Sequence, residues 1–134
     1  MKPKVLIVSA RYYEDFSKSL ELYALSALGA KKIKYKIIPV PGVFEIPVVI
    51  AKNIKKYDGF IALGCVIKGE TPHFDFISQA ATDAIMQLSI DYKKPIGYGI
   101  ITCLNKDQAD VRATKKGQEA TNAVISLLNI KISK

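Results

Sequence analysis

The chain has 134 residues, of which 49% are hydrophobic and 24% are charged, and these proportions predict one compact domain over residues 1–134. They exclude a two-domain protein and an intrinsically disordered chain. The chain has 20 Lys and Arg residues and 12 Asp and Glu residues, which gives a net charge of +8. This charge is compatible with nucleic acid, anionic lipid or a small phosphorylated ligand as a partner.

Short apolar runs alternate with stretches of helical period along the chain. The runs of strand type are residues 5–8, 35–40, 60–63 and 95–101. Apolar residues at helical spacing follow each run, within residues 16–28, 46–54, 76–88 and 120–128, and Gly29 is the stop signal of the first helix. Because crossovers between parallel strands are right-handed, this order predicts a flavodoxin-like three-layer α/β/α sandwich with a four-stranded parallel sheet.

Ligands of such folds bind beyond the carboxyl ends of the strands, so the loops at that edge are the candidate site. After the first strand comes Tyr12, whose ring is either a stacking platform for a heterocycle or a locally packed residue. After the second strand, Pro41 and Gly42 force a turn, and Glu45 lies in the first turn of a helix. Its carboxylate either interacts with the helix dipole or accepts hydrogen bonds from ligand hydroxyls.

The third loop, residues 64–76, contains the single histidine of the chain. Gly69 allows the backbone to approach a ligand closely, and the amides that lead into the next helix offer an anion site. Beside a bound phosphate, His73 is a candidate for proton transfer, because imidazole both takes and gives a proton near neutral pH. Without that neighbour it is an ordinary polar residue of a first helical turn.

Two cations follow the fourth strand. Arg112 and Lys116 lie four residues apart and therefore share one face of a helix. This face is either solvated or a phosphate site, for which the planar guanidinium of arginine is suited. The basic run at residues 31–36 indicates a solvated connection, and aromatic residues interleaved with Lys and Arg are sparse. We therefore expect no nucleic-acid partner.

The sequence also indicates where the protein resides. No apolar run approaches the ~20 residues of a membrane-spanning helix, and the amino terminus enters an apolar run without a cleavage site. We expect a cytoplasmic protein with no membrane partner. Cys65 and Cys103 lie in apolar segments, which favours buried free thiols over a disulfide, and their spacing matches no metal site.

In combination, three motifs resemble the lumazine synthase family. They are VPGVFEIP at residues 40–47, GCVIKGETPHFDF at 64–76 and LNKDQADVR at 104–112, in the family's order and spacing. The resemblance covers nearly the whole chain and implies an enzyme that condenses 5-amino-6-(D-ribitylamino)uracil with 3,4-dihydroxy-2-butanone 4-phosphate, without a cofactor or metal. A flavin- or lumazine-binding module that catalyses nothing is the alternative.

The resemblance also assigns roles to residues of the four loops. His73 matches the residue that transfers protons. The ribitylaminouracil would contact Tyr12, Val43, Phe44, Glu45, Cys65, Val66, Ile67 and Tyr98, of which Tyr98 reaches the site from a neighbouring subunit. The butanone phosphate would contact Glu70, Thr71 and Arg112, with Gly69 and Lys116 as further candidates.

The chain departs from the family pattern in several places. Tyr12 and Tyr13 stand where Phe-Asn is commoner, and Lys68 stands where arginine is frequent. The segment 112–117 is shorter by about one helical turn, and the sequence begins at the first sheet strand, without the family's extra amino-terminal strand. The resemblance implies a homopentamer with shared active sites, and the two shortened regions favour a pentamer that assembles no further.

Overall fold

The computed structural model of the protein describes residues 3–70 and 73–128. Within them, strands and helices alternate as the apolar periodicity predicts. The elements are β1 (Lys4–Ala10), α1 (Glu14–Ala30), β2 (Lys34–Val40), the 3-10 helix η1 (Val43–Glu45), α2 (Ile46–Asn53), β3 (Gly59–Ile67), α3 (Phe74–Tyr92), β4 (Ile96–Cys103) and α4 (Lys106–Leu128).

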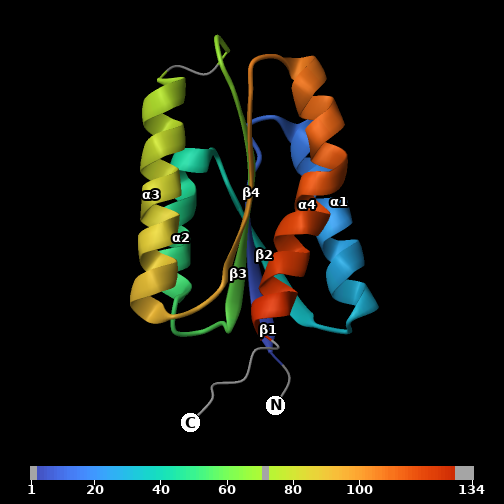
Figure 1. Ribbon diagram of the computed structural model, residues 1–134, viewed down its shortest axis with the longest axis vertical. Helices are drawn as coiled ribbons and strands as arrows, with labels where there is room; N and C mark the ends of the chain where they lie inside the picture. The colour runs from blue at the N-terminus through green and yellow to red at the C-terminus, as the bar shows by residue number, and fades with distance from the viewer. Residues whose placement is uncertain (1–2, 71–72, 129–134) are drawn as a thin grey trace.

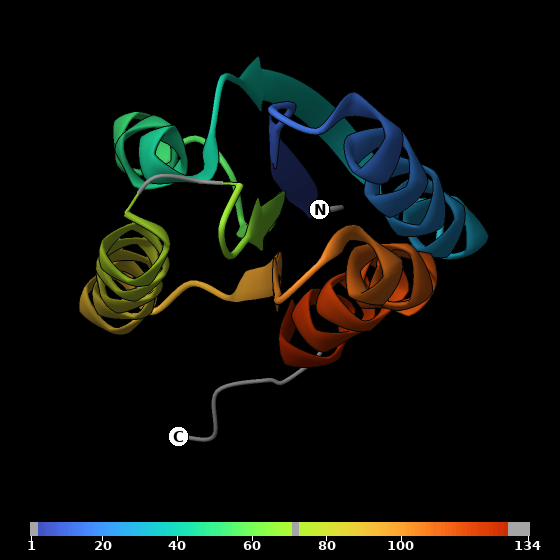
Figure 2. The same cartoon turned by 90° about the horizontal axis from the view of Figure 1, so that it is seen from above.

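The four strands form one parallel sheet in the order β2-β1-β3-β4. Helices α2 and α3 cover one face of this sheet, and α1 and α4 cover the other (Figure 1). Figure 2, seen from above, shows the same three layers, with β2 and β4 at the two edges of the sheet. The predicted flavodoxin-like α/β/α sandwich with a four-stranded parallel sheet is therefore confirmed.

The core lies on both faces of the sheet. Because successive side chains of a strand point to opposite faces, Val5 and Ile7 pack in the cluster on the α1 and α4 side. Leu6 and Val8 pack in the cluster on the α2 and α3 side. Strand β3 is buried along its whole length, since it is central and covered twice. This double covering explains why the first and third apolar runs are continuous rather than alternating.

Several element boundaries differ from the predicted runs, and the differences at β3 and α1 change the predicted third loop and stop signal. Strand β3 continues four residues beyond Leu63, because its ladder with β4 extends to the pair Ile67 and Cys103. Residues 64–67 of the predicted third loop therefore belong to the sheet, and the loop begins at Lys68. Helix α1 includes Gly29 and ends at Ala30. Cys65 and Cys103 are buried free thiols, as predicted. No helix in the described part of the chain has the length and apolar character needed to span a membrane.

Candidate active site

A cavity of about 480 Å³ opens at the carboxyl ends of the strands. Its walls come from the loop after β1, the turn and 3-10 helix after β2, the end of β3 and the start of α3. The lining residues are Tyr12, Pro41, Gly42, Val43, Phe44, Glu45, Cys65, Val66, His73 and Ile77. Apolar and aromatic groups dominate this surface, and one carboxylate and one imidazole interrupt it. Such a surface suits a flat heterocycle that carries a polar chain.

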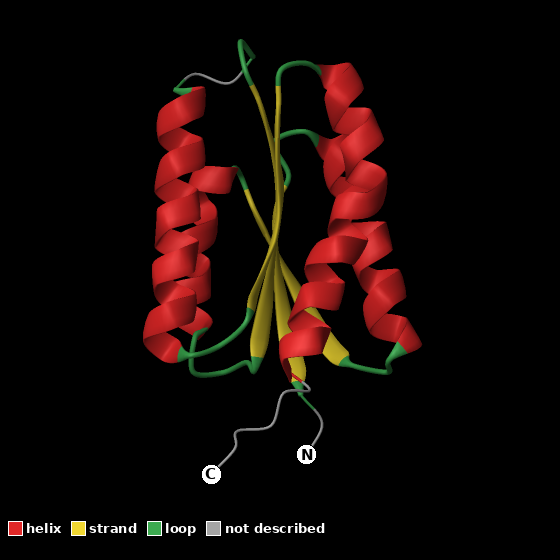
Figure 3. Ribbon diagram, viewed as in Figure 1, coloured by secondary structure: helices red, strands yellow, loops and turns green. Residues whose placement is uncertain are grey.

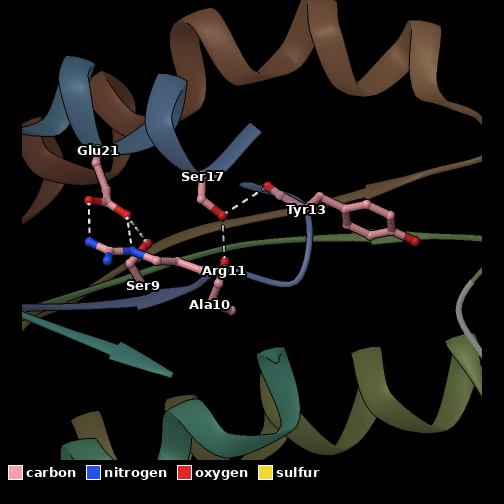
Figure 4. Close-up of polar contacts among 6 residues, drawn as sticks. All are labelled: Ser9, Ala10, Arg11, Tyr13, Ser17 and Glu21. Atoms are coloured by element: carbon pink, nitrogen blue, oxygen red, sulfur yellow. Dashed lines mark hydrogen bonds and ion pairs between the residues drawn. The ribbon is translucent and has the colours of Figure 1, made fainter. Parts of the chain in front are cut away.

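The loop after β1 presents Tyr12 at the mouth of this cavity. The backbone N–H of Arg11 donates to the carbonyl of Val40 at 3.0 Å, which joins the ends of β1 and β2. The Ser17 hydroxyl is within hydrogen-bonding distance of the Ala10 carbonyl at 2.7 Å and the Tyr13 carbonyl at 3.0 Å, as Figure 4 shows. These bonds fix the turn on both sides of Tyr12, whose ring is 62% exposed. The ring is therefore available to a ligand.

An ion pair anchors the same loop on its outer side. The Arg11 guanidinium donates to both carboxylate oxygens of Glu21, at 3.0 and 2.9 Å, and the Ser9 hydroxyl donates to that carboxylate at 2.6 Å. Figure 4 shows the three side chains together on the α1 side. Hydrogen bonding to Glu21 raises the pKa of Arg11, so the guanidinium stays charged. The pair holds the end of β1 against α1.

The segment after β2 forms the second wall. Its backbone turns so that the N–H of Glu45 donates to the carbonyl of Gly42 at 3.2 Å. Val43 is buried under the wall, whereas Phe44 is 61% exposed. Close contact with β3 requires a glycine at position 64, where a Cβ atom would lie 2.7 Å from Val43 Cγ2. Glu45 precedes α2, which contains a proline in its first turn, so the carboxylate is held on a short rigid segment.

Cys65 and Val66 form the floor of the cavity at the end of β3. Burial raises the pKa of the Cys65 thiol to about 12. Burial also raises the pKa of Cys103, against the opposing effect of the nearby Arg112 guanidinium. Both thiols are therefore protonated at neutral pH. The floor offers shape and backbone groups rather than a thiolate nucleophile.

His73 lies on the wall opposite the 3-10 helix, directly before α3. Its backbone is left-handed, with φ 59° and ψ 37°, a conformation that is uncommon outside glycine and in which asparagine, aspartate and histidine are enriched. The carbonyl of His73 accepts a hydrogen bond from the N–H of Ile77 at 2.9 Å, which starts the helix. The imidazole itself is exposed, with the Phe76 ring 6.2 Å away. Solvent and ligand can both reach it.

A second cavity, of about 470 Å³, lies at the β4 edge of the sheet. It is lined by Tyr98, Ile100, Ile101, Thr102, Val111, Arg112, Lys115, Lys116 and Glu119, and so it shares no residue with the first. The Arg112 guanidinium donates to the Thr102 carbonyl at 2.6 Å. The Tyr98 hydroxyl lies 2.8 Å from that of Thr82. Three cations make this cavity suitable for an anion.

The structure therefore divides the predicted site residues between two places. Seven line the first cavity, namely Tyr12, Val43, Phe44, Glu45, Cys65, Val66 and His73. Tyr98, Arg112 and Lys116 line the second. Ile67 is fully buried in the core on the α1 and α4 side.

The remaining predicted residues lie in or near the loop after β3. Glu70 is exposed and forms an ion pair with Lys106, with 3.7 Å between nitrogen and oxygen. Gly69 has φ +84°, in open space, so a glycine is needed there for its backbone conformation. Thr71 lies outside the described residues. Neither Gly69 nor Glu70 lines the two cavities.

Nine lining residues were not predicted as site residues, namely Pro41, Gly42 and Ile77 in the first cavity and Ile100, Ile101, Thr102, Val111, Lys115 and Glu119 in the second. Pro41 and Gly42 are visible in the sequence as a turn, and their position between a strand and Glu45 is the signal that places them at the cavity. Ile77 belongs to the apolar stripe of α3, which gives no sign that one of its members faces a ligand. Lys115 precedes Lys116, and helical spacing alone does not show that both border one cavity.

Comparison with known proteins adds a separate finding. A family model described as 6,7-dimethyl-8-ribityllumazine synthase matches residues 2–131. A protein of that name from Bartonella tribocorum is 43% identical over 97% of this chain and 91% of its own length. One from Agrobacterium fabrum is 40% identical over 97% and 95%, respectively. The 6,7-dimethyl-8-ribityllumazine synthase 1 of Rhodopseudomonas palustris is 41% identical over 96% of this chain and 85% of its own.

Proposed function

Because the chain belongs to the 6,7-dimethyl-8-ribityllumazine synthase family, we propose that its two cavities carry out the condensation that gives the family its name. The enzyme is a transferase of riboflavin biosynthesis. It joins 5-amino-6-(D-ribitylamino)uracil to 3,4-dihydroxy-2-butanone 4-phosphate, forms 6,7-dimethyl-8-ribityllumazine and releases phosphate and water. No step of this reaction needs an external oxidant, because loss of phosphate turns the terminal carbon of the butanone into a methyl group while the neighbouring alcohol carbon becomes a carbonyl.

The first cavity would hold the ribitylaminouracil. Its aromatic and apolar lining suits the pyrimidine, with the exposed Tyr12 ring as the stacking surface. The backbone of Val43 and Phe44 and the carboxylate of Glu45 would bind the ribityl hydroxyls, since a carboxylate accepts hydrogen bonds from several of them. The backbone of residues 65–67 would border the pyrimidine edge. The lining of one cavity by six of the eight residues assigned to this substrate is the observation that supports the assignment most directly.

The butanone phosphate would be held by cations. The guanidinium of Arg112 matches a phosphate through two parallel hydrogen bonds, and Lys116 adds a second positive charge to the same cavity. Glu70 and Thr71 would bind the same substrate from the loop after β3. Phosphate is the leaving group, so cations that bind it also stabilise the charge that develops as it departs.

His73 would move protons during the reaction. The ring amine of the pyrimidine attacks the ketone and forms an imine, phosphate is eliminated, and the resulting carbonyl closes on the nitrogen that carries the ribityl chain. Each step transfers a proton, and imidazole is suited to both directions. The exposed position of His73 on the cavity wall supports this role, because substrate can approach it from the cavity.

The two cavities would form one site between neighbouring copies of the chain. Within one chain they are lined by different residues, and the second lies on the open edge formed by β4 and α4. Placing the β4 edge of one copy against the first cavity of the next would bring Tyr98 to the pyrimidine and Arg112 to the butanone phosphate. Repetition of this contact closes a ring, which we propose is a cytoplasmic homopentamer that assembles no further. Light scattering of the purified protein measures the number of chains in the assembly.

A two-substrate assay tests the function. The purified protein should convert the two substrates into a product with the absorbance and fluorescence of a lumazine, and it should release phosphate in equal amount. A binding module would bind lumazine or flavin, and this binding would quench the ligand's fluorescence, but neither lumazine nor phosphate would be formed faster than in a protein-free control. That result would contradict the enzyme.

A further inference from the structure

The end of the sheet opposite the cavities carries a strong excess of positive charge. Helices α1, α2 and α3 end there and the strands begin there (Figure 3). Nine exposed lysines lie in these helix ends, strand starts and connecting loops, and we call them the basal surface: Lys4, Lys31, Lys32, Lys34, Lys36, Lys52, Lys55, Lys56 and Lys93. The acidic residues of the same described segments are Asp58 and Asp91. Charge on this molecule is therefore polarised along the strands.

The basal charge is not neutralised within the chain. Over residues 3–70 and 73–128, the ion pairs join Arg11 to Glu21 and Lys106 to Glu70, so neither includes a basal lysine. Asp58 accepts a hydrogen bond from a backbone N–H at 2.8 Å, and Asp91 accepts one from a glutamine side chain at 2.7 Å.

Two basal lysines even face each other in the sheet. Lys4 and Lys34 are direct partners across β1 and β2, where like charges are unfavourable. The Asp58 carboxylate lies beside this pair, where it accepts a hydrogen bond from the Lys4 backbone N–H at 2.8 Å, and a bound polyanion would offset the repulsion further.

Tyrosines are interleaved with these lysines. The ammonium of Lys4 lies 5.9 Å from the centroid of the Tyr57 ring. Tyr92, the last residue of α3, is 47% exposed and is followed by Lys93. Tyr35 is also 47% exposed, but it pairs with Val5 and therefore points to the α1 and α4 face, away from Lys34 and Lys36. In the sequence these aromatic residues are far apart, but the fold brings them to one end. Flat aromatic faces among flexible cations are the features with which proteins bind unstacked bases and phosphates together.

The basal groups form a continuous track across the sheet. Lys34 on the edge strand is adjacent to Lys4, which lies over the Tyr57 ring. The ammonium of Lys94 then donates to the backbone carbonyl of Tyr57 at 2.9 Å and to that of Ile54 at 2.6 Å. These bonds hold the loop after α3 against the loop after α2, so Lys93 is fixed at the other end of the track.

We propose that the basal surface binds single-stranded nucleic acid, with lysines on the phosphates and Tyr92 stacking on a base. Every basal cation is a lysine, and point charges on flexible stems follow a backbone of any sequence. A duplex would leave Tyr92 without a partner, because the bases of a duplex are already stacked. The basal surface lies at the end of the strands opposite the cavities. Binding of nucleic acid there is therefore independent of the condensation reaction.

Fluorescence anisotropy with a labelled single-stranded oligonucleotide tests the proposal. An oligo-uridine of about 20 nucleotides and an oligo-thymidine of the same length should both bind, with affinity that falls as salt increases. The double variant Lys34→Glu/Lys36→Glu should weaken binding about tenfold or more and reduce the slope of log K against log salt by about 1.4 if both lysines contact phosphates. Lumazine formation should be unchanged, which also shows that the variant is folded.

A matched control distinguishes the effect of charge at the basal surface from the effect of the net charge of the protein. The triple variant Lys18→Glu/Gln118→Glu/Asn122→Glu alters exposed helix positions away from the basal surface and changes net charge by the same amount. It should bind within about twofold of the parent. Equal loss in the two variants would overturn the proposal, because total charge would then explain the binding.

A second comparison tests the stacking. Tyr92→Ala should weaken oligonucleotide binding about fivefold or more, whereas Tyr23→Ala, at an exposed position on α1, should leave it unchanged. Equal affinity of Tyr92→Ala and the parent would overturn the single-strand assignment in favour of a surface for charge alone. Binding to vesicles that contain phosphatidylserine, with no oligonucleotide bound under the same conditions, would overturn it in favour of a membrane surface.

Discussion

The two cavities of this chain have similar volumes but opposite chemistry. The first, between η1 and α3, is walled by Tyr12, Phe44 and apolar side chains, with His73 and Glu45 as its ionisable groups. The second, on the β4 edge, is bordered by Arg112 and two lysines. One suits a flat heterocycle and the other suits a phosphate. Neither cavity alone has the groups that a reaction between a pyrimidine and a phosphorylated ketone requires.

This contrast indicates how the fold distributes the reaction. The carboxyl ends of the strands create the first cavity within one chain, because the loops after β1, β2 and β3 converge there. The open edge of β4 creates the second, and an edge is where another copy can pack. Each half is built within one chain, and we propose that assembly joins them. The following predictions test the two halves separately and then together.

Replacing His73 should have the largest effect. His73→Asn removes the imidazole while retaining a residue that tolerates the left-handed backbone at this position. We expect kcat to fall about 10²- to 10⁴-fold, because proton transfer is lost while both substrates still bind. Steady-state kinetics with each substrate varied in turn measures this. Turnover equal to that of the parent would remove His73 from the reaction.

Arg112→Ala should have the next largest effect and should act on the other substrate. Loss of a guanidinium that binds phosphate costs about 1.5–3 kcal/mol, so the KM for the butanone phosphate should rise about 10- to 100-fold. The KM for the ribitylaminouracil should change little. Arg112→Lys keeps the charge but not the paired hydrogen bonds, so its KM for the butanone phosphate should lie between those of the parent and Arg112→Ala. An unchanged KM for the phosphorylated substrate in Arg112→Ala would contradict its assignment.

Mixing the two defective proteins tests whether the halves come from different copies. If His73 and Arg112 of one site belong to neighbouring subunits, co-expressed His73→Asn and Arg112→Ala chains should recover about a quarter of the parent's activity, since about a quarter of the sites are then intact. With the butanone phosphate well below the KM of Arg112→Ala, sites contained in one chain would show only the small activity of the two single variants. A monomer in light scattering would refute the shared site independently.

Substitutions of Tyr12 should have a smaller effect, confined to the first half. Tyr12→Ala removes the stacking surface and should raise the KM for the ribitylaminouracil about 3- to 10-fold, with little change in the KM for the butanone phosphate. Tyr12→Phe keeps the ring and should behave as the parent. If the phenylalanine variant is as impaired as the alanine variant, the hydroxyl rather than the ring face matters.

The smallest effect is expected from the thiol of Cys65, a residue of the cavity floor whose side chain packs in the core cluster on the α1 and α4 side. Because the pKa of Cys65 is raised to about 12, the native thiol stays protonated at neutral pH and iodoacetamide should alkylate it far more slowly than in the unfolded chain. In the unfolded chain the thiol has its ordinary pKa of 9.0 and ionises above that pH, whereas in the native protein it stays protonated. The free energy of unfolding should therefore decrease as the pH rises above 9.0. Cys65→Ala should reduce this dependence and leave kcat nearly unchanged. Rapid alkylation of Cys65 in the native protein would contradict a protonated, buried thiol.

Much of the candidate site follows from local sequence. Pro41, Gly42 and Glu45 predict a tight turn that leads into a helix, and the structure has this turn beside the first cavity. The position of His73 before α3 also follows from the sequence. These predictions succeed because turn and helix-start chemistry is decided within a few residues. The sequence does not reveal that β3 runs to Ile67, because pairing with β4, far along the chain, determines its length.

The amino-acid sequence by itself determined the α/β alternation, the parallel sheet, the buried free thiols and the family motifs. Each of these depends on apolar period, turn residues or a short contiguous run, which local physical chemistry governs. Only the tertiary structure decided that Tyr12 and His73 share a cavity while Arg112 and Tyr98 line another, and that Tyr57 and Tyr92 lie among the lysines of the opposite end. Those placements depend on strand order and helix packing between residues distant in sequence, and no local pattern contains that information.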